Sequence, residues 1–200
     1  MDRILTADDL NERLKIYFQL LIRWQKTINL VAPSTMANAW VRHFVDSIQI
    51  LETVPNARRW VDMGSGAGFP GLVTAIQLAG VKDAAVHLIE SDQRKCAFLR
   101  EVSRETGASA TVHNGRIEDV LSRIDDRIDA VSARALGPLS RLIELSADML
   151  LKGAIGVFPK GQDVVRELTG YATDSRFDLQ LLPSITDPRA KIVLVRASRL

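Results

Sequence analysis

The sequence has a single cysteine, Cys96, in 200 residues and no long hydrophobic run. One thiol excludes an intramolecular disulfide framework and any zinc or iron–sulfur site built from several cysteines. No apolar stretch reaches the roughly 18 residues that a membrane-spanning helix needs. The first residues, Met1 to Leu5, lack the apolar segment of a signal peptide. We therefore expect a soluble protein of the reducing cytoplasm.

Neither sign of charge dominates, because 26 basic and 24 acidic residues leave a formal net charge of +2. This balance permits an anionic partner without requiring one. A hydrophobic content of 46% with 25% charged residues is typical of a globular protein and excludes general disorder. We expect an α/β protein with a helical N-terminal extension over residues 1–57 and a core domain over residues 58–200.

The N-terminal segment has the pattern of an amphipathic helix. Thr6 and Asp9 have the spacing of a capping box, with Thr6 as the N-cap. Steps of three and four residues then place a series of apolar side chains on one helix face. These residues are Leu10, Leu14, Tyr17, Leu21, Trp24 and Ile28. Pro33 ends the pattern, and a second helix is predicted from about residue 35 to residue 52.

After Arg59 the sequence alternates between strands and helices. Such alternation predicts a parallel sheet with helices on both faces. The last two strands are too close for a helical crossover, so they are predicted to form an antiparallel hairpin. Strands are predicted at residues 60–63, 85–89, 110–113, 129–132, 154–158, 179–182 and 192–195, and helices at 70–78, 93–105 and 139–151.

The most informative segment is a glycine-rich turn that follows the first predicted strand, Asp62-Met63-Gly64-Ser65-Gly66-Ala67-Gly68-Phe69-Pro70-Gly71. Glycines at this place allow a tight turn and a close approach of the backbone to a ligand. A dinucleotide fingerprint would have its third glycine at Phe69. The shifted glycine and the preceding Asp62 favour S-adenosylmethionine, whose amino group an acid can help to bind.

Two later segments support a nucleoside ligand. Glu90 ends the second strand, where a carboxylate can accept hydrogen bonds from both ribose hydroxyls. Ile117 and Glu118 follow the third strand, near the expected position of an adenine. Each signal has an ordinary alternative, since Glu90 could be a solvated turn residue and Glu118 could be a helix cap.

The fourth strand ends at Ser132-Ala133-Arg134-Ala135, and the motifs missing there narrow the chemistry. There is no Asn/Asp-Pro-Pro-aromatic turn for an exocyclic amine and no Lys-Asp-Lys-Glu tetrad for a hydroxyl acceptor. Cys96 is predicted to be a packing residue on a helix. What remains is an acceptor that is already nucleophilic when neutral, such as a purine ring nitrogen. We interpret Arg134 as a residue that positions cofactor or phosphate, with an ion pair as the alternative.

Arg42, His43 and Asp46 form a second polar cluster, at helical spacing. One histidine and one carboxylate make a poor metal site, so we expect no metal. The cluster predicts either intrahelical ion pairs or a helix that offers Arg42 and His43 to a substrate. A positive surface for phosphates could include Arg23, Lys26, Arg58, Arg59, Lys160, Arg189, Lys191, Arg196 and Arg199.

Together these motifs resemble the 16S ribosomal RNA guanine-N7 methyltransferases, also called glucose-inhibited division protein B. The resemblance runs from about Leu14 to the C-terminus. The combination of an Arg-His-x-x-Asp-Ser motif with a glycine turn that ends in Phe-Pro-Gly is specific. The matching residues are Asn29-Leu30, Val41-Arg42-His43, Asp46-Ser47, Asp62 to Gly71, Lys95, Phe98-Leu99, Gly115 to Glu118, Arg134-Ala135 and Lys160-Gly161.

The resemblance implies a class I S-adenosylmethionine-dependent methyltransferase fold, a Rossmann-like seven-stranded sheet, with a helical N-terminal extension. It implies methyl transfer from S-adenosylmethionine to N7 of one guanine in the 16S ribosomal RNA of the small ribosomal subunit. The cofactor contacts that it implies are Gly64, Phe69, Ile117, Glu118 and Arg134, to which we add Glu90 from the fold.

Because guanine N7 carries no proton, we predict that no side chain acts as an essential general base. Arg134 and Lys160 are candidates for positioning the substrate, and Arg42, His43 and Lys160 are candidates for contact with RNA. We expect a monomer. Three alternatives remain at this point: a nicotinamide-dependent oxidoreductase, a small-molecule methyltransferase, and a non-catalytic RNA-binding protein on the same fold.

Overall fold

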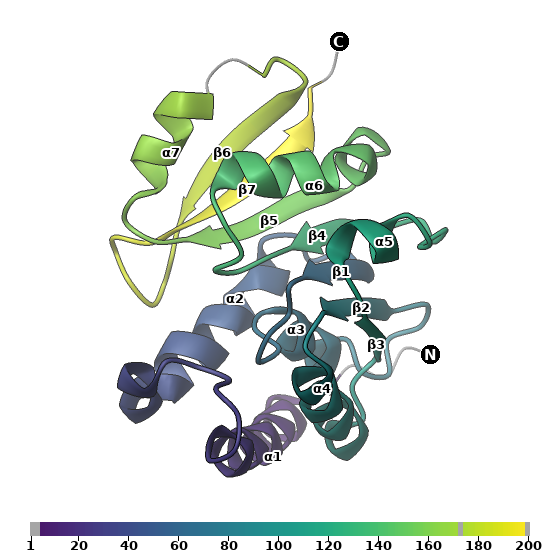
Figure 1. Cartoon of the computed structure of the whole chain (residues 1–200), viewed down its shortest axis with the longest axis vertical. Coiled ribbons are helices and arrows are strands. Elements are labelled where there is room, and N and C mark those ends of the chain that lie inside the picture. Colours follow the sequence, from purple (N-terminus) through teal and green to yellow (C-terminus); the bar gives the residue numbers. More distant parts are fainter. Residues whose placement is uncertain (1–4, 172–173, 199–200) are drawn as a thin grey trace.

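A computed structural model describes residues 5–171 and 174–198 of the chain. Seven strands form one sheet in the order β3-β2-β1-β4-β5-β7-β6, and the last strand in sequence, β7, lies between β5 and β6 (Figure 1). The strands β1 to β5 run parallel, and β7 is antiparallel to both of its neighbours. Their bounds are Arg59–Met63, Ala85–Glu90, Ala110–Asn114, Ala130–Ser132, Ile155–Lys160, Phe177–Pro183 and Lys191–Ala197 for β1 to β7.

Helices cover both faces of the sheet (Figure 1). On one face lie α1 (Ala7–Gln25), α2 (Asp46–Glu52), α3 (Gly71–Gln77) and α4 (Gln93–Thr106). On the other face lie α5 (Ile117–Leu121), α6 (Leu139–Leu151) and α7 (Val164–Tyr171). Alternate residues of β1 enter the two hydrophobic clusters, Trp60 on the α1 side and Val61 on the α6 side. This alternation is the two-residue period of a strand that is buried on both faces.

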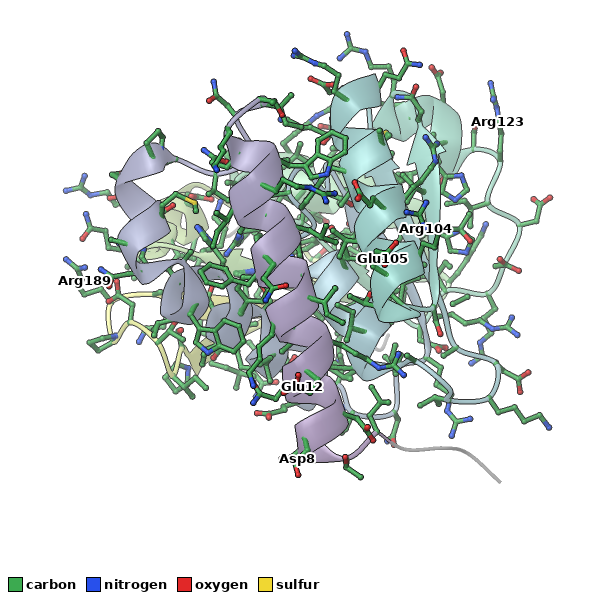
Figure 2. The ribbon with its side chains drawn as sticks, turned by 90° about the horizontal axis from the view of Figure 1, so that it is seen from below. Asp8, Glu12, Arg104, Glu105, Arg123 and Arg189 are labelled. Atoms are coloured by element: carbon green, nitrogen blue, oxygen red, sulfur yellow. The ribbon has the colours of Figure 1, made fainter. Side chains whose placement is uncertain are left out.

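The N-terminal helix α1 begins as the sequence predicted. Thr6 is its N-cap, and the Thr6 hydroxyl accepts a hydrogen bond from the Asp9 amide in a capping box. Leu14, Tyr17 and Leu21 are buried in the same cluster as Trp60. Each such buried side chain stabilises the fold by about 1.5–3 kcal/mol. The helix lies alongside α4, and its acidic residues Asp8 and Glu12 are exposed (Figure 2).

The second predicted helix, residues 35–52, is wrong as a continuous α-helix. The segment contains a 3₁₀ helix η1 (Pro33–Asn38), a π-helix η2 (Trp40–Val45) and then α2. Phe44 is fully buried and packs on the rings of Tyr17 and Phe69, with ring centroids 4.9 and 5.0 Å apart. We attribute the wider turn to this aromatic packing, since π turns are rare in helices and are found frequently at functional sites.

The seven predicted strands and the three predicted helices of the core are confirmed within about three residues. Two short helices, α5 and α7, were not predicted. A signal for α7 was present, because Val164 and Leu168 are four residues apart and both contact the α6-side cluster. Within the described residues, no helix has the length and apolar content needed to cross a bilayer.

Candidate functional site

A cavity of about 620 Å³ opens at the carboxyl ends of the parallel strands. Its walls come from the turns that follow β1, β2, β3 and β4. In an open parallel sheet this edge is where ligands bind, at the point where the strand order reverses. All six residues proposed for cofactor contact line it, namely Gly64, Phe69, Glu90, Ile117, Glu118 and Arg134. Four separate loops therefore meet at one place, as the sequence predicted.

The glycines of the turn after β1 serve two different purposes. Gly64 has φ +66° and lines the cavity, where a Cβ atom would lie 2.7 Å from Cδ1 of Leu136 on the opposite wall. Gly68 has φ +92° and faces the core instead, where a Cβ would lie 2.5 Å from the Tyr17 hydroxyl. The first glycine therefore keeps the cavity open, and the third lets α1 pack against the turn.

Glu90, at the end of β2, is held by the backbone of the neighbouring turns. Its Oε2 accepts a hydrogen bond from the Gly66 amide at 2.9 Å, and its Oε1 accepts one from the Asp92 amide at 2.8 Å. The side chain is largely buried but lines the cavity. A carboxylate oxygen has about two acceptor sites, so Glu90 can still accept hydrogen bonds from a ligand's hydroxyls.

Asp62 is not at the cavity surface, and the expected contact between Asp62 and an amino group is wrong. Its side chain is buried against Gly71 at the start of α3, where Oδ1 accepts a hydrogen bond from the hydroxyl of Ser132 on β4 at 2.6 Å. Burial raises the pKa of Asp62 to about 6, and the hydrogen bond from Ser132 opposes this shift. The alternation of side chains along β1 directs this carboxylate into the protein rather than toward the ligand edge.

Phe69 connects the cavity to the N-terminal helices. It is stacked between Tyr17 and His43, with ring centroids 5.2 and 5.1 Å away. The guanidinium of Arg134 lies 5.1 Å from the centre of its ring. The Tyr17 hydroxyl in turn donates a hydrogen bond to the carbonyl of Ala67 in the glycine turn. The aromatic core of the N-terminal segment thus fixes one wall of the cavity.

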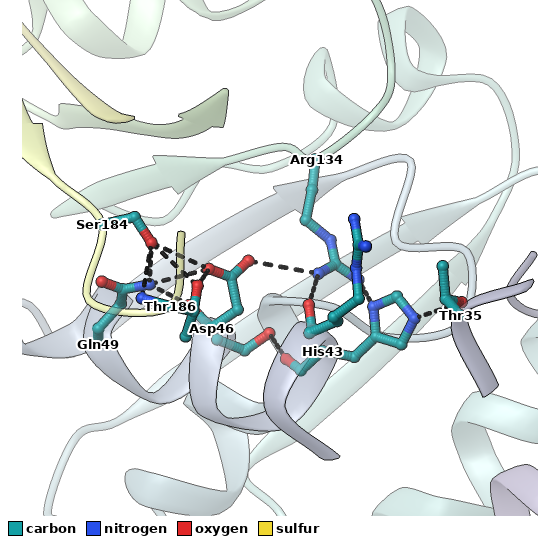
Figure 3. Close-up of polar contacts among 9 residues, drawn as sticks. Thr35, His43, Asp46, Gln49, Arg134, Ser184 and Thr186 are labelled. Carbon is teal, nitrogen blue, oxygen red and sulfur yellow. Dashed lines mark hydrogen bonds and ion pairs between the residues drawn. The ribbon is translucent and has the colours of Figure 1, made fainter. Parts of the chain in front are cut away.

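Arg134, which follows β4, is shared between this cavity and a second one. Its guanidinium donates to the carbonyl of Arg42 at 3.2 Å and contacts His43 Nδ1 at 3.1 Å. The carboxylate of Asp46 lies 3.6 Å away (Figure 3). Burial lowers the pKa of Arg134 from its ordinary value, and Asp46 opposes the shift. The ion pair offered by the sequence is therefore confirmed, with Asp46 as the partner, and the prediction that Arg134 positions cofactor or phosphate concerns a residue that lines the first cavity.

His43 is neutral at physiological pH. Burial, followed by the charges of Arg134 and Arg42, lowers its pKa to about 4. Because Arg134 is the donor at Nδ1, we assign the ring proton to Nε2, which lies 2.9 Å from the Thr35 hydroxyl. The imidazole therefore acts as an acceptor that orients Arg134, and it stays neutral near pH 7.

Asp46 joins the N-terminal segment to the loop between β6 and β7. Its Oδ1 accepts hydrogen bonds from Thr186 Oγ1 at 2.6 Å and from Gln49 Nε2 at 2.9 Å (Figure 3). Ser184 of the same loop contacts Gln49 at 3.2 Å. The ion pairs predicted for Asp46 with Arg42 and His43 are wrong, since in the described part of the chain its ion pair is with Arg134. The π turn at η2 changes which side chains face one another.

The second cavity, of about 450 Å³, contains the three candidates for RNA contact, Arg42, His43 and Lys160. Lys160 is already engaged there, because its ammonium group pairs with Glu167 at 2.8 Å and donates to the carbonyl of Gly137 at 2.9 Å. Arg42 is exposed at the cavity. Arg42 and Lys191 supply positive charge to the walls, and Asp46, Asp163, Glu167 and Asp187 supply negative charge.

Other basic residues of the predicted phosphate surface are dispersed. Arg23 pairs with Glu101 of α4, and Arg189 pairs with Asp187 in the β6–β7 loop. Arg199 lies outside the described residues. Cys96 is buried and donates its thiol to the carbonyl of Glu90, which confirms its interpretation as a packing residue. The basic residues that reach the site are Arg42, Arg134, Lys160 and Lys191, with Lys95, Arg116 and Arg141 at the first cavity.

Sequence reasoning missed the residues that hold Arg134 and its partners in place. Thr35, Gln49, Ser184 and Thr186 have no motif of their own, and Asp46 and Thr186 are 140 positions apart. The only sequence feature that pointed to this network was the Asp46-Ser47 pair, which belongs to the motifs of the resemblance. The contacts of Asp46 and Gln49 with the β6–β7 loop could not be predicted, because they join residues that are far apart in the sequence.

The strand order, with β7 inserted antiparallel, and the glycine turn facing an acid at the end of β2 define the fold of class I methyltransferases. Solved structures agree in fold. A putative O-methyltransferase from Klebsiella pneumoniae matches with a TM-score of 0.65 at 15% identity, covering 98% of this chain and 93% of that one. The O-methyltransferase TomG of Streptomyces achromogenes, solved in complex with SAM, matches with a TM-score of 0.63 at 16% identity, covering 98% of this chain and 92% of that one.

Sequence comparison then identifies the family. The family model for rRNA small subunit methyltransferase G, GidB, matches residues 10–191. A protein of Methylorubrum populi named ribosomal RNA small subunit methyltransferase G is 47% identical over 197 residues, which is 96% of this chain and 93% of that protein. The chain belongs to the rRNA small subunit methyltransferase G family.

Proposed function

We propose that this protein transfers a methyl group from S-adenosylmethionine to N7 of a guanine in the 16S RNA of the small ribosomal subunit. The observation that carries the proposal is the adjacency of two cavities that share Arg134. One is bounded by the glycine turn and by Glu90, and the other is lined by Arg42, His43 and Lys160. A methyl donor in the first would face an acceptor in the second.

The first cavity fits S-adenosylmethionine in shape and in chemistry. Gly64 leaves room that a side chain would remove, and Glu90 supplies an acceptor for ribose hydroxyls. Ile117 offers an apolar surface for the adenine, and Glu118, which pairs with Arg141 at 2.7 Å, lies beside it. Arg134 supplies a cation for the carboxylate of the methionine part. When bound, S-adenosylmethionine contributes an electrophilic methyl group on its sulfonium.

The protein's own part in the reaction is positioning. Guanine N7 has a lone pair and no proton, so the acceptor needs no base. His43 is neutral and bonded to Arg134 and Thr35, while Lys160 is bonded to Glu167 and Gly137. The hydrogen bonds fix the positions of both side chains. In the proposed reaction these side chains hold the guanine so that its N7 approaches the methyl group in line with the bond from the methyl carbon to the sulfonium. Alignment of two bound reactants alone can supply about 7–11 kcal/mol of the barrier reduction.

The partner that we propose is the small-subunit RNA, in the cytoplasm, bound by a monomer of this protein. Arg42 contributes an exposed cation at the second cavity, and His43 and Lys160 complete its wall. A small-molecule methyltransferase would also need the first cavity, but it would not need cations that continue toward the β6–β7 loop. A non-catalytic RNA-binding protein would not need a cavity shaped by Gly64.

The test is methyl transfer with mapping of the product. Small ribosomal subunits, and RNA extracted from them, are prepared from cells that lack this gene and are incubated with labelled S-adenosylmethionine. Incorporation at one guanine, located by chemical cleavage at 7-methylguanine, is the expected result. Label on several positions or on none would overturn the proposal. Binding of S-adenosylmethionine without transfer to either substrate would favour the non-catalytic alternative.

A further inference from the structure

The loop between β6 and β7, residues 184–190, presents the most exposed large apolar side chain among the described residues. Ile185 is 71% exposed, while its neighbours Ser184 and Thr186 point inward and contact Gln49 and Asp46 (Figure 3). Single exposed apolar residues are common on protein surfaces. Exposure alone therefore gives no evidence of a role for Ile185. The evidence comes from the hydrogen bonds that fix the loop and from the residues next to it.

The backbone at Ile185 is fixed to α2. Its amide donates to Gln49 Oε1 at 3.0 Å, and Gln49 is a buried side chain. On one side Ser184 Oγ accepts from Gln49 Nε2, and on the other side Thr186 Oγ1 donates to Asp46 Oδ1. A hydrogen-bond network among partly buried groups gives a loop a defined conformation. The apolar side chain is thus presented to solvent from a rigid support.

Ile185 does not itself line the second cavity, but it lies between residues of the chain that do. Ser184, Thr186 and Asp187, on either side of it, line that cavity together with the cations Arg42 and Lys191. Arg189, on the same loop, extends into solvent beside the η2–α2 segment (Figure 2). The charges near Ile185 are mixed, because Asp46, Asp163, Glu167 and Asp187 line the same cavity and Asp187 pairs with Arg189. Arg42 is exposed there, however, and a guanidinium beside an apolar side chain suits a polyanion whose bases lie between charged phosphates.

An enzyme that modifies a base acts on single-stranded nucleic acid or extrudes the base from its stack. N7 of a purine in an A-form helix lies in a deep, narrow groove that side chains cannot reach. Enzymes that act on bases extrude the target, at a cost of a few kcal/mol, and apolar side chains such as isoleucine can enter the opened step. We propose that Ile185 is a wedge that fills the position vacated by the target base while that base occupies the second cavity. This inference depends on the proposed action on RNA.

The experiment compares Ile185→Ala and Ile185→Met with the wild-type protein. A matched control is Leu151→Ala, since Leu151 is 51% exposed at the end of α6 and neither it nor its neighbours Leu150 and Lys152 line either cavity. Single-turnover methyl transfer to small-subunit RNA is measured with saturating protein and cofactor. Base extrusion is measured from the fluorescence of 2-aminopurine placed beside the mapped guanine.

We expect Ile185→Ala to slow single-turnover transfer by about tenfold or more and to abolish the rise in 2-aminopurine fluorescence, because the open step loses its filler. Affinity for S-adenosylmethionine and the melting temperature stay unchanged, and Ile185→Met restores the rate. A wild-type rate in Ile185→Ala, or a loss explained entirely by weaker RNA binding, would overturn the wedge. Absence of transfer by the wild-type protein would overturn the proposed function instead.

Discussion

The two cavities that meet at Arg134 are built in different ways. The first is assembled from turns at the carboxyl ends of β1, β2, β3 and β4, so the parallel sheet itself brings its residues together. The second joins the N-terminal η2–α2 segment to the end of β5 and to the β6–β7 loop, through hydrogen bonds such as that between Asp46 and Thr186. The first cavity follows from the order of the parallel strands. The second cavity depends on a few polar contacts between residues that are far apart in the sequence. Substitutions should therefore affect them separately.

The largest effect is expected where the first cavity contacts the core. Gly68→Ala places a methyl group 2.5 Å from the Tyr17 hydroxyl and 2.9 Å from Leu72 Cβ, at a φ of +92°. Strain and overpacking together predict a loss of about 3 kcal/mol or more in the free energy of unfolding. Denaturant unfolding measures this loss, and calorimetry measures the accompanying loss of S-adenosylmethionine binding.

Gly137→Ala is the matched control, because a Cβ at Gly137 meets no atom within 4 Å. It should leave the free energy of unfolding and the affinity for S-adenosylmethionine within experimental error of the wild-type values. Equal destabilisation by the two substitutions would mean that Gly68 is not constrained by α1.

The next largest effect is expected at Arg134, the charged one of the two residues, Arg134 and Ala135, that line both cavities. Arg134→Lys keeps the charge but loses the planar group that contacts Arg42, His43 and Asp46 together. Hydrogen bonds of charged groups contribute about 1.5–3 kcal/mol, so methyl transfer should fall roughly ten- to hundredfold. Affinity for cofactor, from calorimetry, and for RNA, from filter binding, should both weaken.

Arg123→Lys provides the comparison, since Arg123 is exposed and lines neither cavity. Its activity should equal that of the wild type. A defect of Arg134→Lys in only one of the two affinities would show that the residue serves one cavity.

A smaller effect, with a pH signature, is expected at His43. His43→Asn keeps an acceptor for Arg134 and should retain most activity, whereas His43→Lys places a second cation there and should reduce it. Because the pKa of His43 falls from 6.5 to about 4 on folding, the folded state binds fewer protons between these values. Its contribution to stability is therefore complete above pH 6.5 and is lost as pH falls toward 4.

Thermal unfolding from pH 4 to pH 8 checks this sign. His43→Asn should show a smaller fall in melting temperature on acidification than the wild type. Methyl transfer by the wild type should show no acidic limb near pH 6.5, and such a limb would contradict the assignment of a neutral His43.

The smallest effect is expected among the cations of the second cavity. Arg42→Gln removes an exposed charge and should reduce the salt dependence of RNA binding by about 0.7–0.9 in the slope of log K against log salt. Lys160→Gln removes a charge already paired with Glu167, so the slope should change less. Binding titrations with RNA at several salt concentrations measure the slope for each variant. Equal slopes for Arg42→Gln and Lys160→Gln would contradict the prediction that Arg42 contributes more to the salt dependence.

Much of the fold could be predicted because its signals are local. The strands after Arg59 are short apolar runs, the glycine turn follows the first of them, and Thr6 caps α1. The η2 segment could not be predicted, because its π turn accompanies the packing of Phe44 between Tyr17 and Phe69. Helix α5 has only five residues, too few for a periodic pattern.

The residues of the candidate site also divide into those that could be predicted from local sequence and those that could not. Glu90 and Ile117 could be placed because each follows a strand in a parallel sheet, where strand ends share one edge. Asp62 was misplaced, because its position ahead of the glycines resembled a ligand contact while the pleat of β1 turns it inward. The partners of Asp46 were beyond local reasoning, since Ser184 and Thr186 reach it only after β6 and β7 have paired.

The insertion of β7 between β5 and β6 also bears on how the protein is made. During translation, β1 to β5 and their helices emerge before residue 191, and they can pair as a parallel sheet with β5 at its edge. That edge remains uncovered, and prone to join another nascent chain, until residues 191–197 have left the ribosome. The first cavity, which is built from the turns after β1 to β4, can thus form early. The second cavity, which is proposed to face RNA, forms only after β7 has been synthesised.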